Sequence, residues 1–181
     1  MTDTTTLQAD YDILAERCRQ KAIDLQETQT ALRDLASDLV DADSKKRSAL
    51  LARRAELVNL RDALDDELAL LSHRRDVAHL AIFEYAEQQA QEKLIDLAKK
   101  RRTARRVLNT LLDDQRRFQS VGRGKMTQAE ADKTDVEFST MIAKAKAESF
   151  LLLRDVNRAS AVHDRARNAL EALRKELGVV E

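Results

Sequence analysis

The chain contains no proline and only three glycines in 181 residues, and two of those glycines, Gly122 and Gly124, lie two residues apart. Because proline and glycine are the residues that most readily end a helix, nothing between Leu7 and Phe118 forces a helix to stop. Just after the glycines, Thr127 and Glu130 have the spacing of a capping box, in which each side chain binds the other residue's backbone N–H. The sequence therefore predicts a long helical segment, a turn at residues 120–127, and a second long helix that returns along the first.

The composition favours long helices over a broad globular core. Aromatic residues make up 3% of the chain, charged residues make up 35%, and there is no tryptophan. With few large side chains, the buried surface has to be a narrow seam between helices. We expect an all-α fold, either an elongated antiparallel coiled-coil hairpin or a three-helix rod with a very long central helix.

The first 42 residues carry a heptad pattern. From Leu7 to Ala42, apolar residues recur in alternating steps of three and four, with Lys21 and Thr28 as polar exceptions. Such a seam needs a partner helix. Residues 1–43 are therefore expected to form an arm that either folds back along the same chain or pairs with another copy.

The segment from Asp41 to Ser48 leaves that choice open. Asp41 with Lys45 and Asp43 with Arg47 are acid-before-base pairs four residues apart, which support an unbroken helix. Against this, Asp43 is a good N-cap for a new helix, and the seam loses its large apolar residues here.

Each alternative makes its own structural prediction. A turn near residue 44 sets an antiparallel register in which paired residue numbers sum to about 89, as for Leu25 with Leu64. A continuous helix leaves the arm to be covered by another copy, which would make the protein an obligate oligomer.

Residues 44–181 are expected to form the hairpin itself. Heptad stripes from Leu80 to Phe118 and from Phe138 to Leu177 match in a register summing to about 246, which opposes Leu94 to Leu152. The third helix would then end near residue 69, Gly178 would cap it, and Leu68–Phe83 would be a three-helix junction. The central helix, of about 74 residues, would be roughly 110 Å long.

The sequence offers little for a membrane or secretory role. The longest run of large apolar residues, Phe150 to Leu153, is far shorter than the roughly 20 residues that cross a bilayer. The first six residues lack the cationic and apolar parts of a secretory signal, and Cys18 is the single cysteine. We expect a cytoplasmic protein without a membrane partner.

Candidate catalytic and metal-binding patterns are weak. Asp76 and His79 lie one helical turn apart, but a carboxylate-bridged metal site needs further inward ligands, and only Glu87 and His163 come near. The segment from Gly122 to Lys125 resembles a phosphate loop, yet Gln119 and Met126 stand where a P-loop has glycine and serine or threonine. We predict no enzyme activity, metal, cofactor or small-molecule substrate.

A basic stripe is the strongest candidate site. Helical spacing places its cations along one flank of the seam, where a phosphate backbone or an acidic protein surface could lie. The residues are Lys99, Arg102, Arg105, Arg106, Arg116, Arg117, Arg123 and Lys125. In the expected register, acids between Glu130 and Glu137 fall beside residues 109–117, so internal ion pairing is the competing interpretation.

The formal net charge is zero, but the charges are segregated. Residues 1–44 carry ten acids and four bases, whereas residues 91–126 carry eleven bases and four acids. This asymmetry favours head-to-tail contacts, internal pairing or an anionic partner.

Residues 97–145 resemble the turn-and-cap segment of small helical proteins encoded by tailed phages and prophages. The resemblance rests on Gly124-Lys-Met-Thr127-Gln-Ala-Glu130-Ala-Asp132, on the preceding Arg105-Arg106-Val107-Leu108, and on Met141. The chain lacks the Tyr-Pro pair of the first helix in those proteins. The resemblance implies that a phage encodes the protein, in which case the virion is an alternative location to the cytoplasm. It implies no catalytic residues.

Two functions are therefore expected to compete. The first is a non-enzymatic coiled-coil protein that acts as a spacer, scaffold or assembly component through self-association or contacts with other proteins. The second is a nucleic-acid-binding accessory protein that uses the basic stripe.

Overall fold

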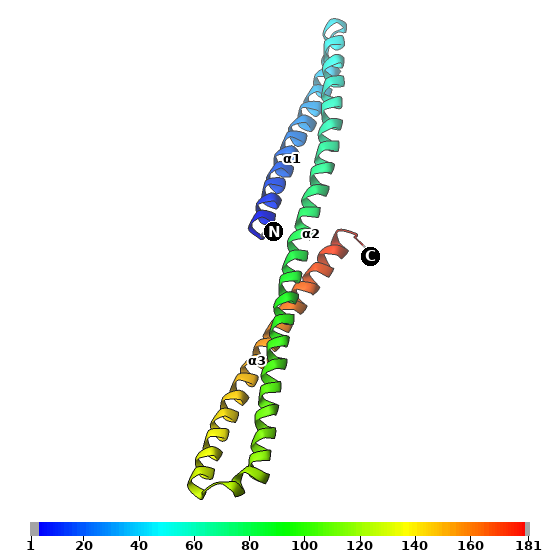
Figure 1. Cartoon of the computed structure of the whole chain (residues 1–181). Helices are drawn as coiled ribbons and strands as arrows, with labels where there is room; N and C mark the ends of the chain where they lie inside the picture. Colours follow the sequence, from blue (N-terminus) through cyan, green and yellow to red (C-terminus); the bar gives the residue numbers. More distant parts are fainter. Residues whose placement is uncertain (1–3, 180–181) are drawn as a thin grey trace. The chain divides into compact units, whose positions relative to one another are not determined.

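The computed structural model describes residues 4–179 and contains three long helices, with no strand in that range. They are α1 (Thr4–Asp41), α2 (Ser44–Arg117) and α3 (Gln128–Glu176) (Figure 1). A π-helical turn, η1 (Phe118–Gly122), and a 3₁₀ turn, η2 (Arg123–Lys125), follow α2. The expected all-α class is confirmed. Over this range, none of the helices combines the length and the apolar character that crossing a bilayer would require.

The helices form two compact units. The first contains the residues up to Tyr85 together with those from Leu173 onward, and the second contains Ala86–Ala172. The first unit thus holds α1 against the first part of α2, and the second holds the hairpin of α2 and α3.

The chain turns between α1 and α2. The backbone N–H groups of Lys45 and Lys46 both donate to Asp43 Oδ1, at 3.1 and 2.8 Å. Asp43 therefore acts as the N-cap that satisfies the first free N–H groups of α2. Only Ala42 and Asp43 separate the two helices.

In the first unit, α1 runs back along α2 in the register expected from the sequence (Figure 1). Lys21 Nζ lies 2.9 Å from Glu67 Oε2, and the rings of Tyr11 and His79 have centroids 4.8 Å apart. These pairs sum to 88 and 90, close to the expected 89. The buried residues of this seam are Cys18, Thr28, Leu35, Leu57, Leu64 and Leu71.

Both other helices contact α2 between His79 and Glu84. The His79 ring packs edge-on against Phe83, with centroids 5.1 Å apart, on the part of α2 that meets Tyr11 of α1. Arg174 of α3 donates to Glu84 Oε1 at 3.0 Å. The end of α3 therefore meets α2 near residue 84, and the predicted end near residue 69 is wrong.

The glycines near the hairpin tip remain helical. Gly122 has φ −71° and ψ −42°, and Gly178 is the only glycine with positive φ among the described residues. A Cβ added to Gly122 would lie 2.8 Å from Phe118 Cδ2, so this glycine makes room for the ring that packs against Phe138 at 5.7 Å between centroids. The turn itself is confined to Met126 and Thr127.

This position of the turn corrects the register of the hairpin. His163 Nε2 lies 3.0 Å from Glu87 Oε1, a pair that sums to 250 and not to the predicted 246. The prediction centred the turn on residue 123, between the glycines. Because the helical run continues to Lys125, the turn lies later in the chain and the paired residue numbers sum to more than 246. The packed rings of Phe118 and Phe138, whose numbers sum to 256, agree with this direction.

Small residues form regular layers in the hairpin seam. Ala90 and Ala104 of α2 are buried, as are Ala131, Ala145 and Ala159 of α3, and within each helix they recur every fourteen residues. Fourteen residues are two heptads, so these alanines stay on one line of their helix.

The predicted caps of α3 are confirmed. Thr127 N donates to Glu130 Oε2 at 3.0 Å, and Glu130 N reaches Thr127 Oγ1 at 3.5 Å, which completes the capping box. At the other end, Gly178 has φ 70°, and the Val179 N–H donates to the Arg174 carbonyl at 2.9 Å. This is the bond of a Schellman cap, which favours glycine at that position.

Candidate interaction surfaces

All eight cations of the basic stripe are exposed on the second unit. Arg116 pairs with Asp113 at 3.4 Å, and Arg123 pairs with Asp132 and Asp135 at 3.3 and 3.6 Å. The remaining six have no ion pair within residues 4–179: Lys99, Arg102, Arg105, Arg106, Arg117 and Lys125.

The register of the hairpin places the acids at the start of α3 away from the middle of the stripe. In a register summing to 250, the segment from Glu130 to Glu137 lies opposite residues 113–120, and Glu130 already caps the helix. Residues 97–112 contain Lys99, Lys100, Arg101, Arg102, Arg105 and Arg106 and no acid. Opposite them, α3 contributes Lys144 and Lys146 with Glu148 as the nearest acid. The stripe is therefore a concentrated positive surface.

The seam of the second unit contains one polar layer. The Glu87 and His163 side chains are 24% and 16% exposed and share the 3.0 Å hydrogen bond. His163 Nδ1 also lies 3.7 Å from Asp164 Oδ1. The layer is satisfied within the protein, which gives both residues a structural role.

The Asp76 and His79 pair is used for packing. Arg75 donates to Asp76 Oδ1 at 2.7 Å, and this hydrogen bond raises the pKa of Arg75. His79 is placed between the rings of Tyr11 and Phe83. In the part of the chain that the structure describes, no cluster of three His, Cys, Asp or Glu side chains could hold a metal ion.

An ion pair joins α1 and α2 at the edge of the seam of the first unit. Lys21, a polar member of the α1 heptad, reaches Glu67 of α2, and this hydrogen bond raises the pKa of Lys21. Thr28, the other polar member, donates to the Asp24 carbonyl at 2.9 Å and is buried. Both polar heptad positions are therefore satisfied without a second copy.

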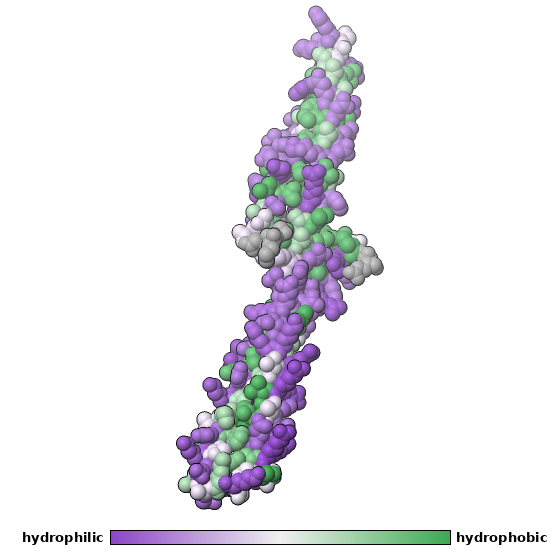
Figure 2. Space-filling model, viewed as in Figure 1, coloured by the Kyte–Doolittle hydropathy of each residue, from purple (hydrophilic) through white to green (hydrophobic). Residues whose placement is uncertain are grey.

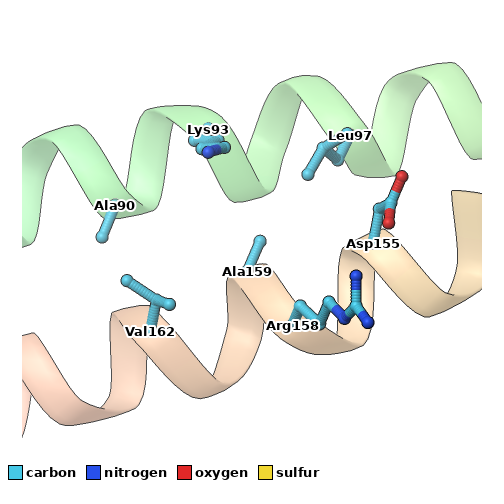
Figure 3. A pocket seen from close by; sticks show the side chains of 7 residues that line it. All are labelled: Ala90, Lys93, Leu97, Asp155, Arg158, Ala159 and Val162. Carbon is cyan, nitrogen blue, oxygen red and sulfur yellow. The ribbon is translucent and has the colours of Figure 1, made fainter.

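A shallow groove opens on one side of the hairpin seam (Figure 3). Ala90, Ala159 and Val162 form its apolar part, with Lys93, Asp155 and Arg158 around it. The groove exists because two alanines meet where larger residues would fill the space. Its lining carries no arrangement of nucleophile and base.

Large apolar side chains are also exposed on helix faces away from the seams. On α3, Val136 and Phe150 are 65% and 66% exposed, and with Ala143 they recur every seven residues along one line. On the first unit, Val40 is 82% exposed, and Leu60 and Leu70 are about half exposed. Figure 2 shows such apolar patches between charged side chains. The seven-residue spacing of the three α3 residues is the sequence feature from which their exposed line could have been predicted.

The capping box gives a pH-dependent prediction. Hydrogen bonds from Thr127 lower the pKa of Glu130, so its stabilisation is complete above the ordinary carboxyl pKa and is lost as pH falls through the lower folded value. Glu130→Ala is therefore expected to lower the melting temperature at neutral pH, and the difference from wild type should vanish in strong acid. Thermal unfolding across pH measures this. Glu137→Ala, also exposed, is the control, and a difference that grows in acid would contradict the assignment.

No protein-family model, curated protein or solved structure matches the chain.

Proposed function

We propose that this chain is a non-enzymatic coiled-coil protein that acts as a spacer, scaffold or assembly component and associates with copies of itself or with other proteins. The observation that carries the proposal is the exposure of large apolar side chains on helix faces that the seams do not cover, above all Val40, Val136 and Phe150. Val136 and Phe150 lie with Ala143 on one line of α3 outside the seam, and such an apolar helix face is where a further helix can pack.

The packing of each unit supports the same proposal. Among the described residues, no large side chain is less than 2% exposed, because most of each seam is only two helices wide. A helix with apolar residues on more than one face needs more than one partner. A further helix from another molecule would supply that cover.

The setting we propose is the assembly of a tailed phage. Its support is the resemblance of residues 97–145 to small helical phage and prophage proteins. In that setting the protein acts in the cytoplasm of the host or in the virion.

Self-association is the first test. The weight-average mass from sedimentation equilibrium is expected to rise with concentration, because association buries the exposed apolar residues. Replacing Val136 and Phe150 with Ser should weaken the association, while Val121→Ser and Val162→Ser serve as controls with similarly exposed aliphatic side chains. A chain that stays monomeric at millimolar concentration, and that binds no other protein, would count against the proposal.

A second candidate function is nucleic-acid binding, which the six cations without ion pairs favour. With six phosphate contacts, the affinity for duplex DNA should fall about a thousandfold between about 50 and 200 mM salt. Replacing Arg102, Arg105 and Arg106 with Gln should lower the slope of log affinity against log salt by about three. The control is the triple Gln variant of Lys133, Arg154 and Arg165. Binding that ignores salt, or an equal effect of the control, would exclude a role for the stripe.

A further inference from the structure

The first unit carries an acidic row that is nearly as long as the part of the basic stripe on α2. Along α1, carboxylates recur in steps of three and four, interrupted by Ala31, and so lie on one line of the helix. The row consists of Asp24, Glu27, Asp34, Asp38 and Asp41. It spans 18 residues, and the part of the basic stripe on α2, Lys99–Arg117, spans 19.

The row is not neutralised within the chain. Glu27, Asp34, Asp38 and Asp41 are exposed, and none has an ion pair within the described residues. Arg33 is the single base between Asp24 and Asp41. Exposed carboxylates without ion pairs on one unit thus have the opposite charge to the exposed cations without ion pairs on the other.

Exposed apolar side chains accompany both rows. Val40 and Leu60, 82% and 48% exposed, lie on the two helices of the pair that carries the acidic row. Ile95 and Phe150, 47% and 66% exposed, lie on the two helices of the hairpin that carries the basic stripe. An interface needs apolar contact as well as complementary charge, and these helices carry exposed apolar side chains in addition to their charged ones.

We propose that the acidic row of α1 in one copy docks on the basic stripe of α2 in a second copy. The inference deepens the proposed assembly function and rests on it, since it names the partner and the two faces. A second copy is the occupant because the same chain carries both an acidic row and a basic stripe whose charges are largely without ion pairs. The two rows are similar in length, and the net charge of the chain is zero. A nucleic acid would use the stripe alone and would leave the acidic row without a role.

Charge reversal tests the pairing. The first variant changes Arg102, Arg105 and Arg106 to Glu, and the second changes Glu27, Asp34 and Asp38 to Lys. Each variant alone should associate at least about a hundredfold more weakly than wild type, because like charges then oppose one another. An equimolar mixture should recover the association, since the reversed rows are complementary across the two variants.

The measurements are sedimentation velocity on the full chain and circular dichroism to verify helicity. Lys133, Arg154 and Arg165, exposed cations outside the stripe, changed together to Glu, give a control with the same change in charge. Gln versions of both variants supply a milder perturbation if a reversed variant fails to fold. Each Gln variant should associate more weakly than wild type, and mixing should restore association, because the first keeps the acidic row and the second keeps the basic stripe.

The outcomes separate this inference from the function on which it rests. If both reversed variants associate as strongly as wild type, the docking of the two rows is overturned and self-assembly stands. The same holds if the mixture of the two variants fails to recover the association. A wild type that is monomeric at all concentrations overturns both. Loss of DNA binding in the first variant, with wild-type self-association unchanged, assigns the stripe to nucleic acid and also overturns the docking.

Discussion

Leu64→Ala is expected to lower the free energy of unfolding of the α1–α2 pair by about 2 to 5 kcal/mol. Leu64 is 6% exposed and lies between Leu57 and Leu71 in the middle of the seam of the first unit. Few other buried side chains cover this two-helix seam, so the loss of one leucine removes a large part of what holds α1 on α2.

Amide hydrogen exchange is the appropriate measurement, because it reports each segment separately. Protection should fall in α1 and in residues 44–70 and remain unchanged between residues 90 and 160. Leu60→Ala is the matched control, since Leu60 is 48% exposed and outside the seam. Equal losses in both compact units would show that they unfold as one cooperative body.

The second large effect concerns the polar layer of the hairpin. His163→Leu alone should destabilise the second unit by about 1 to 3 kcal/mol, because Glu87 then loses its hydrogen bond in a mostly buried place. Glu87→Leu combined with His163→Leu should instead raise stability by about 1 to 4 kcal/mol, since two apolar side chains replace a partly buried polar pair.

Urea unfolding of the single and double variants measures the two effects. Arg167 and Glu171 form an exposed pair at 3.0 Å, and their double Leu replacement is the control for a pair outside the seam. That control should change stability by less than about 1 kcal/mol. A double seam variant less stable than His163→Leu would show that the polar layer contributes net stability.

The seams were predictable from the sequence because helix packing follows the spacing of apolar residues. The fold-back register near 89 follows from matching leucines such as Leu25 and Leu64, and the Lys21 to Glu67 contact agrees with it. The existence of the turn stayed open, because Asp43 serves equally well as an N-cap and as a helical partner of Arg47. Only tertiary packing of α1 decides between these roles.

The register of the hairpin was harder to predict for a local reason. The sequence places the turn at the glycines, yet Gly122 is helical. A side chain at residue 122 would collide with the ring of Phe118, and this accounts for the glycine. Heptad patterns alternate in steps of three and four, so after a shift of four about half of the apolar residues still meet apolar positions of the other helix. Composition alone does not reveal which of two such registers a turn imposes.

The candidate site was predicted in part. The eight cations of the stripe are visible in the sequence, but the structure is needed to show that Arg116 and Arg123 form ion pairs and that the other six do not within the described residues. The exposed line of Val136 and Phe150 needed the seam to be assigned first, since only then do these residues fall outside it.

The repeated alanine layers give the hairpin an adjustable length. Removing residues 97–103 from α2 and residues 146–152 from α3 deletes one heptad from each helix and leaves every remaining layer matched. Each such paired deletion would shorten the hairpin by about 10.5 Å without a new turn or a new seam. Paired insertions of one heptad would lengthen the hairpin by the same amount. The distance from the hairpin tip to the far end of the unit can therefore change through evolution in fixed steps of one heptad.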